Sequence, residues 1–329
     1  MPTYTGISSE AFRHPLDSQA EQALRSVPGF NLLARKFVEF VYERPQSIYL
    51  MGNSIQVGPR QYANLYHLFR ECVRDLDIQP EPTLFVSQSS TVNAYALGEE
   101  HPSIVLNTAL LDLLTEAELR SVIAHELGHI KCGHTTLNQM ARWAIVVVSG
   151  LAGMTFGLTT LVSTGLILAF FEWLRKAELS ADRAALLVMD ELNPVLHSMM
   201  KMAGGSRKYA HEISIDEFIR QSERYQGLDQ DALNQVYKFL LYNNFSDGVF
   251  LTHPFTVERV HYLQEWSTSD SYRQIRMGNY THASEEGSVD VSSSETNDST
   301  SPSQDVDELR RQIASLQEEI DRIKRSKTS

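Results

Sequence analysis

The feature that constrains this chain most is a pair of histidines, His125 and His129, in the segment SVIAHELGHIKCGH (121–134). Residues four apart lie on one face of a helix, one turn from each other. Two imidazoles at this spacing can bind one zinc ion, and Glu126 beside them could act as general base on a water molecule at that metal. The fold must then bring a further ligand to this helical face.

The segment around the two histidines is predicted to be helical from about Glu116 to about Ala141. Thr115 and Glu118 have the spacing of a capping box, which marks a helix start. Gly128 weakens the helix slightly, and no proline lies within it. Apolar residues recur at helical spacing, at Leu119, Val122, Ile123, Leu127 and Ile130.

The H-E-x-x-H pattern fixes only three residues and also occurs by chance, so on its own it supports a zinc site and a coincidence about equally. A third ligand in a fitting position would favour the zinc site. The candidate is Glu178, in KAELSADRAALLVMD (176–190). Glu178 and Asp182 share a helical face, so Glu178 could bind zinc while Asp182 accepts a hydrogen bond from the far nitrogen of a ligand histidine. Without such a context, the pair would be interpreted as a solvated charged face.

Four motifs in this order resemble the HtpX-like zinc metallopeptidases, a group that includes the CAAX prenyl endopeptidases and the Oma-type and BepA-type quality-control proteases. The similarity extends over residues 81–266, more than half of the chain. The motifs are VNAYALGEEHPSIVLNTALLDLL (92–114), AHELGHIKCGH (124–134), AELSADRAAL (177–186) and THPFTVERV (252–260).

This resemblance implies zinc ligands at His125, His129 and Glu178, with a general base at Glu126 and a supporting carboxylate at Asp182. It implies one zinc ion per chain, in a site with two histidine ligands and one glutamate ligand.

The resemblance also implies a functional histidine near the metal, His253, in the THP motif. It would be either a group that stabilises an oxyanion or a ligand to zinc in a resting state. A loop histidine without such a role is the alternative. Further along, Arg259 either binds a carboxylate such as Asp182 or faces solvent.

Short strands are predicted just before the zinc helix, in TLFVSQ (83–88) and NAYALG (93–98), and a strand in SIVLNTALL (103–111) leads into a helix. Metallopeptidases of this type bind substrate as an added strand at a sheet edge. Residues 92–98 are the candidate edge, with Asn93 and Ala94 nearest to the scissile bond by family resemblance. The alternative is that these strands only support the core.

No charged residue occurs from Trp143 to Phe171, between the two halves of the predicted metal site. About 20 apolar residues span a bilayer as a helix. A single crossing would, however, place His125 and Glu178 on opposite sides of the membrane. We therefore predict an apolar helical hairpin over 143–171, which either enters the membrane or is buried against protein. Basic residues on both flanks favour a cytoplasmic location for its ends.

The segments outside this core are predicted to be helix, linker and coiled coil. Residues 1–80 form a helical segment with helices over 17–26, 31–42 and 60–76, and three more helices follow over 193–202, 213–225 and 229–242. Residues 283–304, rich in Ser, Thr and acidic residues, form a disordered linker. Residues 305–326 form a helix with an a/d seam over 306–323, which pairs with a second copy or a helical partner, or stays a lone marginal helix.

Composition narrows the range of functions. The formal net charge of −12 argues against nucleic-acid binding, which needs basic patches. Two cysteines, Cys72 and Cys132, give no disulfide framework and suit a reducing compartment. The first residues lack the basic-then-apolar pattern of a signal peptide, so we expect the chain to stay in the cytoplasm or face it. The apolar stretch over 143–171 adds the expectation of membrane association on that side.

The sequence therefore predicts an α+β, mainly helical fold: a gluzincin-like zinc protease core with a small sheet, an apolar helical hairpin and a C-terminal coiled-coil helix. The predicted function is a zinc metalloendopeptidase that hydrolyses unfolded or membrane-associated polypeptides. One alternative is a catalytically silent zinc-binding adaptor that acts through its coiled coil. Another is a zinc hydrolase that is not a peptidase, which would have no need of the edge strand.

Overall fold

The computed structural model describes residues 3–26, 43–140, 158–229, 234–235, 238, 241–244, 249–250 and 254–283. They all belong to one compact unit, Met1–Glu286. Several predicted features lie outside the described residues: the helix over 31–42, residues 143–157 of the apolar hairpin, His253, residues 284–304 of the linker and the helix over 305–326. The hairpin, its membrane contact, the linker and the coiled coil therefore stay predictions.

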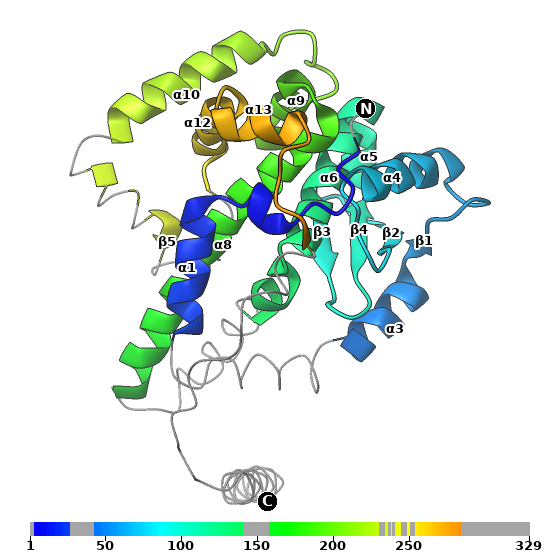
Figure 1. The fold of residues 1–329 in the computed structure, drawn as a ribbon, viewed down its shortest axis with the longest axis horizontal. Helices are drawn as coiled ribbons and strands as arrows, with labels where there is room; N and C mark the ends of the chain where they lie inside the picture. The colour runs from blue at the N-terminus through cyan, green and yellow to red at the C-terminus, as the bar shows by residue number, and fades with distance from the viewer. Residues whose placement is uncertain are drawn as a thin grey trace, which may run out of the picture. The chain divides into compact units, whose positions relative to one another are not determined.

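The described part of the chain is mainly helical and contains a four-stranded sheet, in agreement with the predicted α+β class (Figure 1). Its helices are α1 (Pro15–Arg25), α3 (Glu43–Asn53), α4 (Ala63–Asp75), α5 (Thr108–Leu113), α6 (Glu116–Lys131), α8 (Leu158–Met189), α9 (Leu192–Gly204), α10 (Ile215–Asp229), α12 (Thr256–Ser267) and α13 (Asp270–Arg276), with a 3-10 helix at Ser9–Ala11. Its strands are β1 (Ile55–Gln56), β2 (Thr83–Ser87), β3 (Ala94–Leu97), β4 (Ser103–Asn107), β5 (Asn243–Asn244) and β6 (Val249–Phe250).

The sheet has the strand order β1-β2-β4-β3. The strands β2 and β4 are parallel, and β1 and β3 run antiparallel to their neighbours. The three strands predicted before the zinc helix are therefore present, and β3, the predicted substrate edge, is at an edge of the sheet. The short strand β1 was not predicted.

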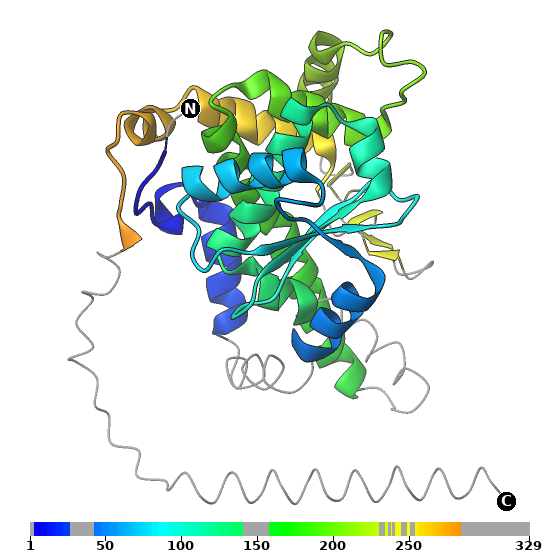
Figure 2. The same cartoon turned by 90° about the vertical axis from the view of Figure 1, so that its right-hand side faces the viewer.

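The helices α6 and α8 pack against each other, with the sheet on one side of this pair and α1 on the other (Figures 1 and 2). The start of α6 is the predicted capping box: the Glu118 amide donates to Thr115 Oγ1 (3.4 Å), and the Thr115 amide donates to Glu118 Oε2 (2.8 Å). Both bonds satisfy amides that have no partner within the helix. This cap sets where the helical face with His125 begins.

The two helices approach each other most closely at Gly128. A Cβ atom on this residue would lie 2.6 Å from Ala184 Cβ and 3.0 Å from Ala181 Cα. Real Cβ atoms do not approach other heavy atoms this closely, so a side chain at position 128 would force the two helices apart. Glycine has a low helix propensity. At position 128, however, it allows α8 to pack directly against the face of α6 that carries His125 and His129.

The helix α6 ends at Lys131, earlier than predicted. The Cys132 amide donates to the Gly128 carbonyl and the Gly133 amide to the Ile130 carbonyl, both at 3.0 Å, and Gly133 has φ +69°. A glycine in the left-handed region is a common helix terminator. Residues 134–140 are again helical. The prediction of one helix to Ala141 was wrong because it ignored this glycine.

Other predicted helices have observed counterparts. The helices α1 and α4 correspond to the predictions over 17–26 and 60–76, and α9 and α10 to those over 193–202 and 213–225. The helix α3 was missed, because Arg44-Pro45 was interpreted as a break. Pro45 lies in the first turn of α3, where a missing amide hydrogen costs no helical bond.

Within the ranges that the structure describes, no helix has both the length and the apolar character that a membrane crossing requires.

Replacing Gly128 with alanine tests the role of the close helix crossing. We expect Gly128→Ala to lower the free energy of unfolding by about 1–3 kcal/mol, the usual cost of overpacking, as measured by urea or thermal unfolding of the metal-free protein. Gly227→Ala, in α10, is the matched control, because a Cβ there meets nothing within 4 Å. Equal stability of the two variants would contradict this explanation.

Candidate metal centre

The packing of α6 on α8 brings the three predicted ligand residues together. One ligand atom from each of His125, His129 and Glu178 lies within 4.8 Å of the others. Nε2 of His125 lies 3.3 Å from Glu178 Oε2, and Nε2 of His129 lies 3.4 Å from Glu178 Oε1. The glutamate is buried, and only a small part of either imidazole reaches solvent.

These distances and atom types fit a zinc ion. Ligands 2.0–2.1 Å from a tetrahedral zinc are separated by roughly 3.3–3.4 Å, close to the two nitrogen–oxygen distances above. Two imidazoles and one carboxylate also form the ligand set of catalytic zinc sites that keep a fourth position for water or substrate. The cluster is therefore a candidate metal site.

Asp182 orients the first histidine. Its Oδ1 lies 3.0 Å from His125 Nδ1, so the imidazole donates from Nδ1 and presents Nε2 to Glu178. Asp182 is held in turn by Arg259, whose Nε and Nη2 donate to the two carboxylate oxygens at 2.8 and 2.5 Å. The structure therefore contains the predicted contact between Arg259 and Asp182. A carboxylate behind a ligand histidine fixes the tautomer and the ring orientation.

The charges at this centre depend on one another. Burial alone would raise the pKa of Asp182, but Arg259 and His125 lower it below its usual value. Burial alone would lower the pKa of Arg259, but Asp182, Glu178 and Glu126 raise it above its usual value. The carboxylate and the guanidinium thus stay charged in a site that is largely buried.

His125 carries a proton in the metal-free site. Burial opposes its charge, but hydrogen bonds to Asp182 and Glu178 raise its pKa to about 10. A metal ion needs the lone pair that this proton occupies, so proton and metal compete for the same nitrogen.

Glu126 follows His125 on α6 and is buried. Its carboxylate is among the charges that act on Arg259, which places it in the same electrostatic environment as Asp182 and Glu178. The candidate general base and the candidate ligands are thus gathered in one place. His253 lies outside the described residues, and its role stays a prediction.

Ala94 is the first residue of the edge strand β3 and Asn93 directly precedes it; β3 contacts α6. The Asn107 amide donates to the Asn93 carbonyl at 3.1 Å, and opposite residues of an antiparallel pair alternate between bonded and non-bonded. The peptide groups of Ala94 and Ala96 therefore point away from β4, toward the edge. Among the described residues, no strand pairs with this side of β3.

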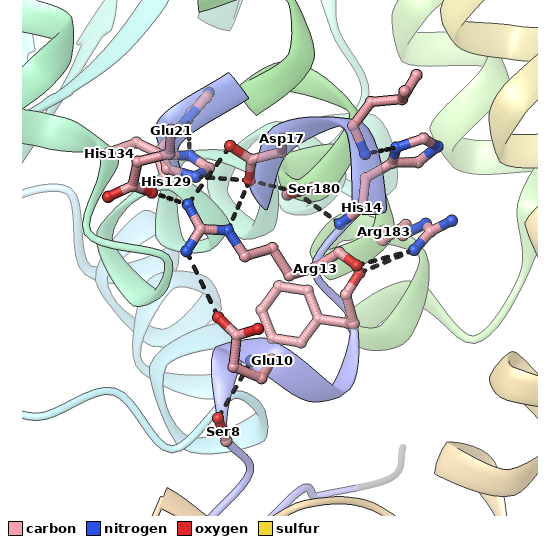
Figure 3. Close-up of polar contacts among 12 residues, drawn as sticks. Ser8, Glu10, Arg13, His14, Asp17, Glu21, His129, His134, Ser180 and Arg183 are labelled. Carbon is pink, nitrogen blue, oxygen red and sulfur yellow. Dashed lines mark hydrogen bonds and ion pairs between the residues drawn. The ribbon is translucent and has the colours of Figure 1, made fainter. Parts of the chain in front are cut away.

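Two residues near the second histidine, His134 and Asp17, were not predicted from the sequence. His129 Nδ1 lies 3.0 Å from His134 Nδ1, and His134 Nε2 lies 3.0 Å from Asp17 Oδ2 (Figure 3). In an unbroken helix, residues five apart point in directions about 140° apart and do not meet. The break at Gly133 turns His134 back toward His129. A glycine at this position is a signal for the end of a helix, so the break could have been predicted from the sequence. No pattern in the sequence pointed to Asp17.

A family model described as Peptidase family M48 matches residues 59–267. The chain belongs to peptidase family M48. The family match confirms the resemblance to the HtpX-like metallopeptidases that the four motifs indicated.

Individual relatives of this M48 peptidase agree with the family match. It is 34% identical over 274 residues to plastoglobule-localized metallopeptidase 48, chloroplastic, of Arabidopsis thaliana, which covers 83% of this chain and 76% of that protein. It is 26% identical over 221 residues to a protease HtpX homolog of Helicobacter pylori, which covers 60% of this chain and 65% of the relative. Membership of this family makes the protein a metallopeptidase that acts on polypeptides.

The protonated state of His125 generates a prediction about metal binding. At pH 7.5, binding of Zn²⁺ to the metal-free protein should release about one proton from this histidine, and the affinity should rise as the pH approaches 10. Calorimetric titration in two buffers of different ionisation enthalpy measures the released protons. Asp182→Asn removes a group that raises the pKa of His125 and should reduce the release. Zinc binding without proton release would contradict this assignment.

Proposed function

We propose that this M48 peptidase is a zinc-dependent endopeptidase with one zinc ion per chain, held by His125, His129 and Glu178. The observation that carries the proposal is the spacing of these three side chains, which suits a tetrahedral zinc ion. Zinc fits this ligand set better than calcium or magnesium, which prefer oxygen ligands.

The residues around the cluster have complementary roles in peptide hydrolysis. A bound zinc ion would supply Lewis acidity toward a peptide carbonyl and a water molecule. Glu126 accepts a proton from the attacking water and then donates it to the leaving amine, the usual role of a general base beside a metal. Asp182 and Arg259 hold His125 in place and balance the charge of the buried carboxylates. His253 is the candidate for stabilising the oxyanion, by family resemblance.

The edge strand β3 is the proposed place for the substrate backbone. The outward peptide groups of Ala94 and Ala96 offer hydrogen bonds to an extended polypeptide, which would bind as a further strand beside β3. Strand addition recognises the peptide backbone and requires an extended segment. We therefore infer that the substrates are unfolded or membrane-associated polypeptides of the quality-control type, rather than compact folded proteins.

Removing the proposed general base tests the catalytic assignment. Glu126→Gln should reduce cleavage of unfolded casein by about two to four orders of magnitude, while one zinc ion per chain stays bound. Glu116→Gln is the matched control, because Glu116 is an exposed glutamate of the same helix.

Three outcomes of this assay are informative. Wild-type activity that disappears with a chelator and in Glu126→Gln supports the endopeptidase. Equal activity in both proteins would point to a different base. Stoichiometric zinc without activity in the wild type would favour the silent zinc-binding adaptor.

Methylated peptides test the proposed strand addition at β3. An extended peptide beside an edge strand uses every second backbone amide as a donor. Methylating one set of alternate nitrogens should weaken a competing peptide about threefold to tenfold per lost bond, whereas methylating the other set should not. The inhibition of casein cleavage measures both. Equal effects of the two sets would argue against binding at a sheet edge.

A further inference from the structure

The N-terminal segment, residues 3–26, packs against α8, the helix that carries Glu178. The Arg183 guanidinium of α8 donates to the carbonyls of Phe12 (3.3 Å) and Arg13 (3.1 Å). Ser180, also of α8, accepts from the His14 amide at 2.9 Å. The segment precedes the residues that the family model matches, which begin at 59. These contacts place α1 directly beside the metal-ligand helix α8 (Figure 1).

Asp17 is the point at which this segment reaches the metal centre. Its side chain is fully buried and contacts His134, which is also fully buried. Arg13 Nε donates to Asp17 Oδ2 at 2.9 Å, and Ser180 Oγ donates to the same oxygen at 2.6 Å (Figure 3). A carboxylate this deeply buried is stable because Arg13 balances its charge and Ser180 donates a further hydrogen bond to it.

The order of donors and acceptors between Asp17 and His129 follows from the ligand geometry. The Nε2 atom of His129 faces Glu178, so a bound metal ion would use the lone pair of Nε2 and the ring hydrogen would lie on Nδ1. That hydrogen must be donated to Nδ1 of His134, the atom 3.0 Å away. The hydrogen of His134 then lies on Nε2 and is donated to Asp17 Oδ2, also at 3.0 Å. An ionised carboxylate can only accept, so Asp17 favours the same order from the other end: His134 keeps its hydrogen on Nε2, and its Nδ1 accepts from His129.

We propose that Asp17 and His134 are positioning residues for the metal ligand His129, and that the N-terminal segment is thereby a working part of the metal centre. The inference rests on the proposed metal site and extends it to a segment outside the matched family region. His129 thus has support equivalent to that which Asp182 gives to His125. Such partners commonly change metal affinity 10- to 100-fold when they are removed.

The test measures zinc affinity of the full chain by competition with a chromogenic chelator, alongside thermal unfolding of the metal-free protein. Asp17→Asn should weaken zinc binding 10- to 100-fold. Glu21→Gln is the matched control: Glu21 lies on the same helix and also pairs with Arg13, whereas the carboxylate that pairs with His134 is that of Asp17. The control should bind zinc with the wild-type affinity.

A second pair of variants separates positioning from packing. His134→Leu fills the space but offers no acceptor, so it should weaken zinc binding to a similar extent as Asp17→Asn. His134→Asn places an amide oxygen near the position of Nδ1 and should recover most of the affinity. This pair also keeps the test usable if Asp17→Asn fails to fold.

The outcomes distinguish this inference from the proposed function. Wild-type zinc affinity in Asp17→Asn and His134→Leu, with only the unfolding temperature lowered, would overturn it and leave a structural contact. Equal losses in His134→Leu and His134→Asn would also overturn it. A wild-type chain that binds no zinc at one ion per chain would instead refute the proposed metal site itself.

Discussion

At Gly128 the backbones of α6 and α8 come so close that even a methyl group would lie 2.6 Å from Ala184 Cβ. The three candidate ligands come from these two helices, and only a close crossing places a carboxylate of α8 within 3.4 Å of both imidazoles of α6. The capping box at Thr115 and the close contact at Gly128 therefore both determine where the two histidines of α6 lie relative to Glu178. The small residues Ala181 and Ala184 on α8 complete this constraint.

Both candidate ligand histidines are supported from behind by a buried carboxylate that an arginine holds. For His125 the series is direct, through Asp182 to Arg259. For His129 it includes an additional imidazole and ends at Asp17 and Arg13. The two arginines come from segments far apart in the sequence, so the electrostatics of one small site join α12, α8, α6 and α1. A buried carboxylate without its arginine would lose much of its preference for the ionised form.

Local sequence patterns predicted those parts of the site that depend on local geometry. The spacing of His125 and His129, the cap at Thr115 and the shared face of Glu178 and Asp182 all follow from helical periodicity. The strands before α6 followed from apolar runs and turn residues. The contacts of Asp17 could not be predicted in this way, because they depend on how α1 packs on α8, a tertiary arrangement with no periodic signal. His134 is intermediate: its position depends on one glycine whose left-handed backbone ends α6, and the predicted continuous helix concealed it.

The packing of the N-terminal segment on α8 determines when the metal centre can be completed during translation. Ser180 and Arg183 follow Asp17 by more than 160 residues, and the partner of Ile7 is His282, later still in the chain. At typical elongation rates of about 5–20 residues per second, Ser180 and Arg183 are made roughly 8–33 seconds after Asp17. The support behind His129 therefore forms only after α8 has been made, and the contact of Arg259 with Asp182 behind His125 follows later still. The metal centre of a nascent peptidase of this kind stays incomplete until α8 and then α12 have been made.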